Sequence, residues 1–133
     1  MKKSVLMLSM ACVAFLLLSF VTRKFNDPWP VPEKYQKMAN PVKSDAESLA
    51  KGKALWGQHC KSCHGTKGKG DGPKAAQLDT ECGDFTTADF QKQSDGALYY
   101  KTFEGRKDMP SFKKKITDES DMWAVVNYMR SMK

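Results

Sequence analysis

The chain has 133 residues and a formal net charge of +7, from 22 lysines and arginines against 15 aspartates and glutamates. This length allows one modest domain with a tail and excludes a two-domain enzyme with a large cleft, while a charged fraction of 28% excludes a protein embedded wholly in a membrane. A small basic domain is typical of a nucleic-acid binder, so the position of the charges along the chain matters.

An apolar run over residues 5–21 follows Lys2 and Lys3, which is the pattern of an export signal. The run is longer than the roughly 7–15 residues of a signal-peptide core and just long enough for the roughly 17–25 residues that span a bilayer. No convincing cleavage site follows, so residues 1–21 are predicted to be an uncleaved signal anchor, with a removed signal peptide and lipidation of Cys12 as alternatives. The lysines before the run favour a cytoplasmic N-terminus. We therefore expect a membrane-anchored protein whose remaining residues are extracytoplasmic, on the periplasmic side of the cytoplasmic membrane.

Much of the positive charge belongs to this anchor. Four basic residues flank the apolar run, at Lys2, Lys3, Arg23 and Lys24. Residues 25–133 then hold 18 basic and 15 acidic residues, a net charge of only +3. Both the modest charge and the expected compartment argue against nucleic acid as a partner.

Residues 22–43 are predicted to form a proline-rich linker, because proline fixes φ and removes a backbone donor. Trp29 and Tyr35 in this segment have two interpretations. They contact the membrane interface or the following domain, or they dock the chain to a larger membrane complex. The four prolines are Pro28, Pro30, Pro32 and Pro41.

Residues 44–133 are expected to form one all-α domain. Ser44 and Glu47 have the spacing of a capping box that opens a helix. We predict helices over residues 45–59 and 73–78, a third that Ser94 caps and Gly105 stops after about residue 103, and a last one that Asp118 or Thr117 opens and that runs to about residue 130. Loops are expected at 65–73 and 79–93. No alternating strand pattern is present. A domain of about 90 residues with so few helices has a thin core and needs a staple, a metal or a cofactor.

Residues 60–64 read Cys-Lys-Ser-Cys-His, the pattern of a c-type haem attachment site. Cys60 and Cys63 lie about one helical turn apart and can reach the two vinyl groups at one edge of a porphyrin. His64 then projects its imidazole toward the iron from the same face. We therefore predict one covalently attached haem c.

Two other sites would use these cysteines. A disulfide between Cys60 and Cys63 suits an exported protein but leaves His64 without a role. A zinc site would add Cys82 and either His64 or His59 as ligands. Adjacent Cys63 and His64 are awkward as two ligands of one tetrahedral ion, so the haem site is favoured.

The second axial position of the iron has few candidate ligands. Met122, Met129 and Met132 lie on or after the last predicted helix, where core packing is expected. Met109 lies instead in a loop, 45 residues after His64, and a loop can bring its sulfur to the opposite face of the ring. We predict His64 and Met109 as the axial ligands; without a haem, Met109 would be a packing or exposed residue.

Four segments together resemble the monohaem class I cytochromes c of bacteria. They are WGQHCKSCHG at 56–65, GKGDGP at 68–73, GRKDMPSF at 105–112 and WAVVNYMR at 123–130. The resemblance covers about residues 44–133. It implies the small all-α class I cytochrome c fold around one covalently bound haem.

The resemblance also implies specific contacts. The first and last helices would cross at right angles, with Gly52 and Trp56 packed against Tyr128 and Trp123. The Pro73 carbonyl would accept a hydrogen bond from Nδ1–H of His64, which fixes the ring and tunes the metal.

Cys82 departs from the family, which usually has proline or another non-thiol residue at this position. An inert buried thiol, an intermolecular disulfide and a reactive thiol are the three alternatives for it.

His/Met ligation fills both axial positions and raises the reduction potential, which suits one-electron transfer. We expect an electron carrier rather than an enzyme, in a respiratory or related chain, with redox proteins or a membrane oxidoreductase complex as partners or as the assembly it belongs to. A haem-based ligand sensor or peroxidase-like enzyme with a labile sixth ligand is the alternative, and a zinc-stabilised binding module is another. Docking is expected to use the lysines near the haem edge and the Met109 loop: Lys61, Lys67, Lys69, Lys74, Arg106, Lys107 and Lys113–Lys115.

Overall fold

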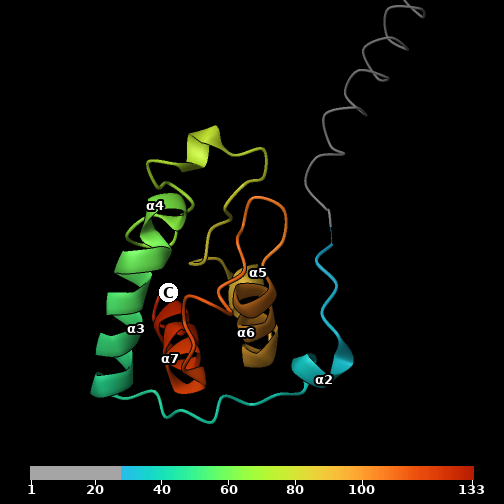
Figure 1. Cartoon of the computed structure of the whole chain (residues 1–133), viewed down its shortest axis with the longest axis vertical. Helices are drawn as coiled ribbons and strands as arrows, with labels where there is room; N and C mark the ends of the chain where they lie inside the picture. Colours follow the sequence, from blue (N-terminus) through green and yellow to red (C-terminus); the bar gives the residue numbers. More distant parts are fainter. Residues whose placement is uncertain (1–27) are drawn as a thin grey trace, which may run out of the picture. The chain divides into compact units, whose positions relative to one another are not determined.

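The computed structural model describes residues 28–133, so the predicted signal anchor and the start of the linker lie outside the described residues. Within this part the chain is helical, without a strand, which confirms the all-α prediction. None of these helices is long and apolar enough to cross a bilayer. In chain order the helices are α2 (Glu33–Gln36), α3 (Ala46–His59), α4 (Lys61–His64), the 3-10 helix η2 (Ala75–Gln77), α5 (Ala88–Gln91), α6 (Asp95–Glu104) and α7 (Glu119–Arg130) (Figure 1).

The capping box of α3 lies one residue later than predicted. The Ser48 N–H donates to Oδ1 of Asp45 at 3.0 Å, and the Asp45 N–H donates to Oγ of Ser48 at 3.3 Å. Ser48 is buried, and its hydroxyl also donates to the Lys43 carbonyl at 2.8 Å. The capping box is therefore formed by Asp45 and the buried Ser48, whereas Ser44 and Glu47 remain exposed.

The starts of α6 and α7 agree with the predicted helices, whereas α5 was not predicted. Ser94 and Asp118 cap α6 and α7 through their side chains, as predicted, and α6 ends at Gly105 with a φ of 69°. The segment expected to be irregular at 79–93 contains the short helix α5, because the Thr87 hydroxyl accepts from the N–H of Phe90 and caps it.

Helices α3 and α7 make the main interhelical contact (Figure 1). Gly52 allows it, because a Cβ at this position would lie 2.1 Å from the Ala124 carbonyl oxygen. Trp56 packs edge-on against Tyr128 with ring centroids 5.9 Å apart, as the resemblance implied. Trp123 does not take part as implied; it stacks on Tyr99 of α6 at 4.3 Å, since it lies on the other side of α7.

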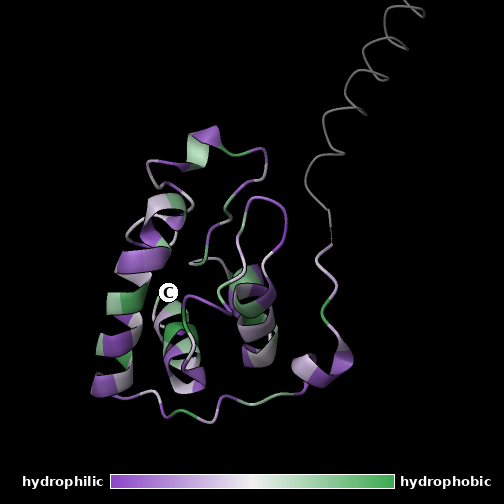
Figure 2. Ribbon diagram, in the orientation of Figure 1, coloured by the Kyte–Doolittle hydropathy of each residue, from purple (hydrophilic) through white to green (hydrophobic). Residues whose placement is uncertain are grey.

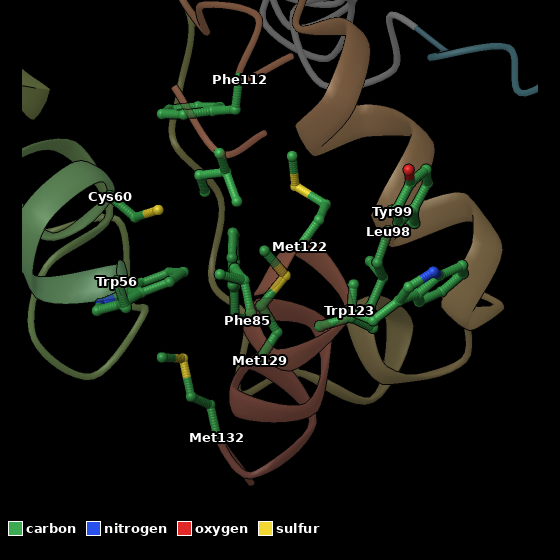
Figure 3. Close-up of a cluster of buried hydrophobic side chains, with 13 residues drawn as sticks. Trp56, Cys60, Phe85, Leu98, Tyr99, Phe112, Met122, Trp123, Met129 and Met132 are labelled. Carbon is green, nitrogen blue, oxygen red and sulfur yellow. The ribbon is translucent and has the colours of Figure 1, made fainter. Parts of the chain in front are cut away.

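The buried core joins α3, α6, α7 and the loop residues that lie over them (Figure 3). Figure 2 shows apolar and hydrophilic bands alternating along α3, as expected of a helix with one buried face. The largest fully buried side chains are Trp56, Trp123, Met122, Val125, Val126 and Thr102.

The compact unit begins at Val31, so part of the predicted linker belongs to the domain. Tyr35 packs against Tyr100 with ring centroids 4.7 Å apart, and the absence of a Cβ at Gly96 lets the Tyr35 carbonyl approach α6. Buried Asn127 donates to the Val42 carbonyl at 3.1 Å and its Oδ1 accepts from Asn40 at 2.9 Å. Of the two interpretations of Tyr35, packing onto the domain is the one observed.

Candidate haem site

The Cys-Lys-Ser-Cys-His motif forms the short helix α4 directly after α3. The N–H groups of Cys63 and His64 both donate to the Cys60 carbonyl, at 3.1 and 3.0 Å. This turn places both thiols and the imidazole on one short rigid element. Cys60, Cys63 and Cys82 are all free thiols, so the Cys60–Cys63 disulfide is not formed.

Burial sets the protonation of this motif. The Cys60 side chain points toward the buried cluster that contains Trp56 and Phe112 (Figure 3). Burial, followed by the charge of Cys63, raises the pKa of the Cys60 thiol to about 12. Burial also lowers the pKa of His64, which outweighs the hydrogen bond to its ring. His64 is therefore neutral at physiological pH, and neutral imidazole is the form that binds a metal.

The glycine-rich loop that follows wraps closely around α4. The N–H groups of Gly70, Gly72 and Lys74 donate to the carbonyls of His64, Cys63 and Ser62, at 3.0, 3.1 and 2.8 Å. A Cβ at Gly72 would lie 2.6 Å from the backbone of Cys63, so only glycine fits there. The loop fixes the backbone of the motif from its carboxyl end.

His64 is oriented by Cys82 and not by Pro73, which corrects the contact implied by the resemblance. Nδ1 of His64 lies 3.0 Å from the Cys82 carbonyl oxygen. A carbonyl only accepts, so Nδ1 carries the proton and Nε2 keeps its lone pair for a metal.

The loop that contains Pro73 and the segment that contains Cys82 explain why the Cys82 carbonyl is the one that contacts His64. The residues on both sides of Pro73 already donate to α4, which fixes the Pro73 region against the helix. Gly83 turns the following segment with a φ of 68°, and Gly70, without a Cβ, lets it approach: a Cβ there would lie 2.7 Å from the Gly83 carbonyl oxygen. The Cys82 carbonyl can therefore reach the imidazole.

The Cys82 side chain is half-buried. Burial raises the pKa of its thiol, and the charges of Cys63 and Asp108 raise it further. A raised thiol pKa lowers the thiolate fraction, which argues against the reactive-thiol alternative.

Met109 lies at the end of a tight turn between α6 and α7. The Arg106 N–H donates to the Met109 carbonyl at 2.8 Å and the Met109 N–H donates back at 3.0 Å, with Lys107 between them at a φ of 53°. The Met109 side chain is half-buried and packs against the core cluster. The turn is joined to the Cys82 segment, because the Asp108 carboxylate accepts from the N–H of Thr80 at 2.9 Å.

Aromatic rings surround His64. Its ring centroid lies 4.8 Å from that of Phe85 and 5.7 Å from that of Trp56. The indole N–H of Trp56 donates to the Gly65 carbonyl at 3.0 Å, which ties α3 to the end of the motif. His59 is separate from this group and packs edge-on against Phe112 at 6.0 Å.

The zinc alternative finds no support. Residues 28–133 contain no group of three or more His, Cys, Asp or Glu side chains placed to hold a metal ion. The donors instead suit a haem: two free thiols on one helical turn, a neutral imidazole with its Nε2 available, and apolar rings beside it.

Two features of the site were missed by the sequence reasoning, the Cys82 carbonyl and the Asp108–Thr80 hydrogen bond. Both depend on loop conformation. The available signals were Gly83, directly after Cys82, and an acidic residue directly before the predicted methionine ligand.

The fold and the site define a haem-binding protein of the c type. The family model for cytochrome c matches residues 49–133, and the chain belongs to the cytochrome c family. It binds a c-type haem covalently. The residues that fit attachment are Cys60 and Cys63.

The chain is similar to solved structures of other proteins. A chain of the reducing HAO-like protein complex Kustc0457/Kustc0458 of Kuenenia stuttgartiensis is similar with a TM-score of 0.62 and 26% sequence identity. The similarity covers 82% of the present chain and 52% of that chain, so the protein spans about half the length of this relative. A comparison with curated proteins gave no match.

Proposed function

We propose that the protein is a monohaem class I cytochrome c, tethered to the membrane by residues 1–21 and acting on its extracytoplasmic side. In this proposal Cys60 and Cys63 form the thioethers, and His64 and Met109 are the axial ligands. The protein carries single electrons in a respiratory or related chain, as a free carrier or as a fixed subunit of a larger oxidoreductase.

One observation carries the ligand assignment. The segment Thr80–Cys82 hydrogen-bonds to His64 through the Cys82 carbonyl and to the turn of Met109 through the Thr80 N–H. The end of α4 with His64 and the turn with Met109, 45 positions later in the sequence, therefore meet on one short segment. This supports His64 and Met109 being parts of the same site.

The chain's own residues prepare the site for electron transfer. A bound haem supplies an iron that gains or loses one electron. His64 is held neutral by burial and in one tautomer by the Cys82 carbonyl. Met109 would be the second ligand of the iron, and methionine ligation would raise the reduction potential. With His64 and Met109 both bound to the iron, oxygen and peroxide would find no open position, and the two ligands would need little rearrangement between the oxidation states.

The relative in Kuenenia stuttgartiensis is a chain of a protein complex, which supports a role within a larger redox assembly for the present protein. The partners of that relative are the other chains of its own complex. For this chain we propose a redox protein or a membrane oxidoreductase complex as the partner.

The surface beside α4 supports an acidic partner. A shallow hollow of about 450 Å³ is lined by Lys61, Lys67 and Lys69 together with one carboxylate, Asp71. Gly65, next to His64, lines the same hollow. Positive charge at this place would attract anionic redox partners and raise their association rate.

Oxidation of the ferrous protein by small reagents of opposite charge tests this role. We expect ferricyanide, an anion, to react quickly and to slow severalfold as ionic strength rises from about 0.01 to 0.2 M, because screening weakens the attraction. A cationic cobalt(III) chelate should react more slowly and gain speed with salt. Stopped-flow absorbance measures both rates.

Replacing Lys67 and Lys69 by glutamine should flatten both responses, whereas replacing Lys34, outside the site, should not. Equal salt responses for the two reagents would contradict the basic docking surface. A protein that takes up no electron reversibly in a redox titration would contradict the proposed function itself.

A further inference from the structure

The segment that links His64 of α4 to the turn of Met109 makes hydrogen bonds at three places. Its Cys82 carbonyl accepts from Nδ1–H of His64, and its Thr80 N–H donates to the Asp108 carboxylate at 2.9 Å. Beyond Cys82, the Phe85 N–H donates to the Gly68 carbonyl at 2.7 Å, which fastens the segment to the glycine-rich loop. Residues 80–85, called here the bridging segment, are thus fastened to the glycine-rich loop at one end and to a carboxylate side chain at the other.

The carboxylate that holds Thr80 belongs to Asp108, which immediately precedes Met109. Asp108 lies inside the turn closed by the two hydrogen bonds between Arg106 and Met109. Because this turn is short and closed, a displacement of Asp108 moves the Met109 backbone with it. The loop of Asp108 (orange) and the segment of Thr80 (yellow-green) lie side by side in Figure 1.

We propose that Asp108 is a positioning residue that holds Met109 on the iron by fastening its turn to the bridging segment, and that the same contact steadies the Cys82 carbonyl on His64. The proposal rests on the His64 and Met109 ligation proposed above. In this proposal the bridging segment couples the position of His64 to the position of Met109. Removal of the Asp108–Thr80 hydrogen bond then loosens both ligands, although Asp108 is not itself a ligand of the iron.

Two substitutions at Asp108 separate the hydrogen bond from the charge. Asp108→Ala removes both the acceptor and the negative charge. Asp108→Asn removes the charge but keeps an amide oxygen that accepts from the Thr80 N–H. Glu104→Ala is the matched control, because Glu104 is an acidic residue just before the same loop whose carboxylate pairs with Lys113 at 2.7 Å and not with the bridging segment.

The first measurement is imidazole binding to the ferric haem-loaded protein, followed by loss of the sulfur-to-iron charge-transfer band. We expect Asp108→Ala to bind imidazole about three- to tenfold more tightly than the unmodified protein, the size of one net hydrogen bond. Asp108→Asn and Glu104→Ala should stay within about twofold of it. Equal effects of Asp108→Ala and Asp108→Asn, or no effect of either, would overturn the proposal.

The second measurement is exchange of the His64 Nδ1 proton with solvent, observed by NMR of the diamagnetic ferrous protein. We expect faster exchange in Asp108→Ala only, because the Cys82 carbonyl has lost one support of its segment. Unchanged exchange with loosened Met109 would overturn the joining of the two ligands. An unmodified protein without the charge-transfer band would refute the Met109 ligation itself, and this proposal with it; a band that is present and insensitive to Asp108→Ala refutes this proposal alone.

Discussion

Substituting Met109 by alanine should lower the reduction potential of the haem and open its iron to external ligands. Methionine stabilises ferrous iron, and axial ligation sets haem potentials over a range of roughly 0.8 V, so we expect a fall on the order of 0.2 V. The vacated position should then bind carbon monoxide in the ferrous protein without a slow dissociation step. Spectroelectrochemical titration and stopped-flow absorbance measure the two effects.

Met122→Leu is the matched control, because Met122 is a fully buried core residue of α7 and the exchange nearly conserves volume. It should change the stability slightly and leave the potential and the charge-transfer band as they are. If Met109→Ala kept the potential and the spectrum of the unmodified protein while Met122→Leu altered them, the ligand would lie on α7 and our assignment would be wrong.

Substituting Gly52 by alanine should destabilise the fold more than a typical surface substitution. The new Cβ would lie 2.1 Å from the Ala124 carbonyl oxygen and 2.8 Å from Cβ of Tyr128, so α3 and α7 must move apart. Overpacking of this kind costs typically 1–3 kcal/mol and occasionally more, and alanine recovers about 1 kcal/mol in helix propensity. Because the contact here is with backbone, we expect a net loss of about 2 kcal/mol in the free energy of unfolding.

Gly57→Ala, five residues later on the same helix, is the control. Nothing lies within 4 Å of a Cβ at this exposed position, so only helix propensity changes. It should gain about 0.5–1 kcal/mol. Guanidinium unfolding of the haem-loaded proteins, followed by far-UV circular dichroism, gives both values. Equal changes for the two variants would show that the α3–α7 contact does not depend on a glycine.

Much of the fold follows from local sequence signals. Ser94 and Asp118 predict the starts of α6 and α7, since each side chain caps the helix that follows it. The attachment motif predicts that its two thiols and its imidazole lie on one helical turn, because haem attachment needs all three groups close together. The family model and the structure agree with the covalent haem expected from these five residues.

Other features depend on contacts that local sequence does not reveal. The start of α3 shifted by one residue because Ser48 is buried and reaches the Lys43 carbonyl. The segment that begins at Val31 packs onto the domain because it contacts Asn127 and Gly96, which lie more than 50 positions away in the sequence. The hydrogen-bond partner of His64 is Cys82 and not the expected Pro73, because two glycines allow one loop to approach another. The last two are long-range contacts, and all three features had been assigned by local pattern or by resemblance alone.

The visible absorption spectrum of the purified haem-loaded chain, recorded in both oxidation states and after addition of carbon monoxide, distinguishes two fixed axial ligands from an open iron. We expect a covalently bound, six-coordinate low-spin haem with the sulfur-to-iron band in the ferric protein and no rapid change with carbon monoxide in the ferrous protein. A high-spin spectrum without the sulfur band, together with fast carbon monoxide binding, would contradict an electron carrier with two fixed axial ligands.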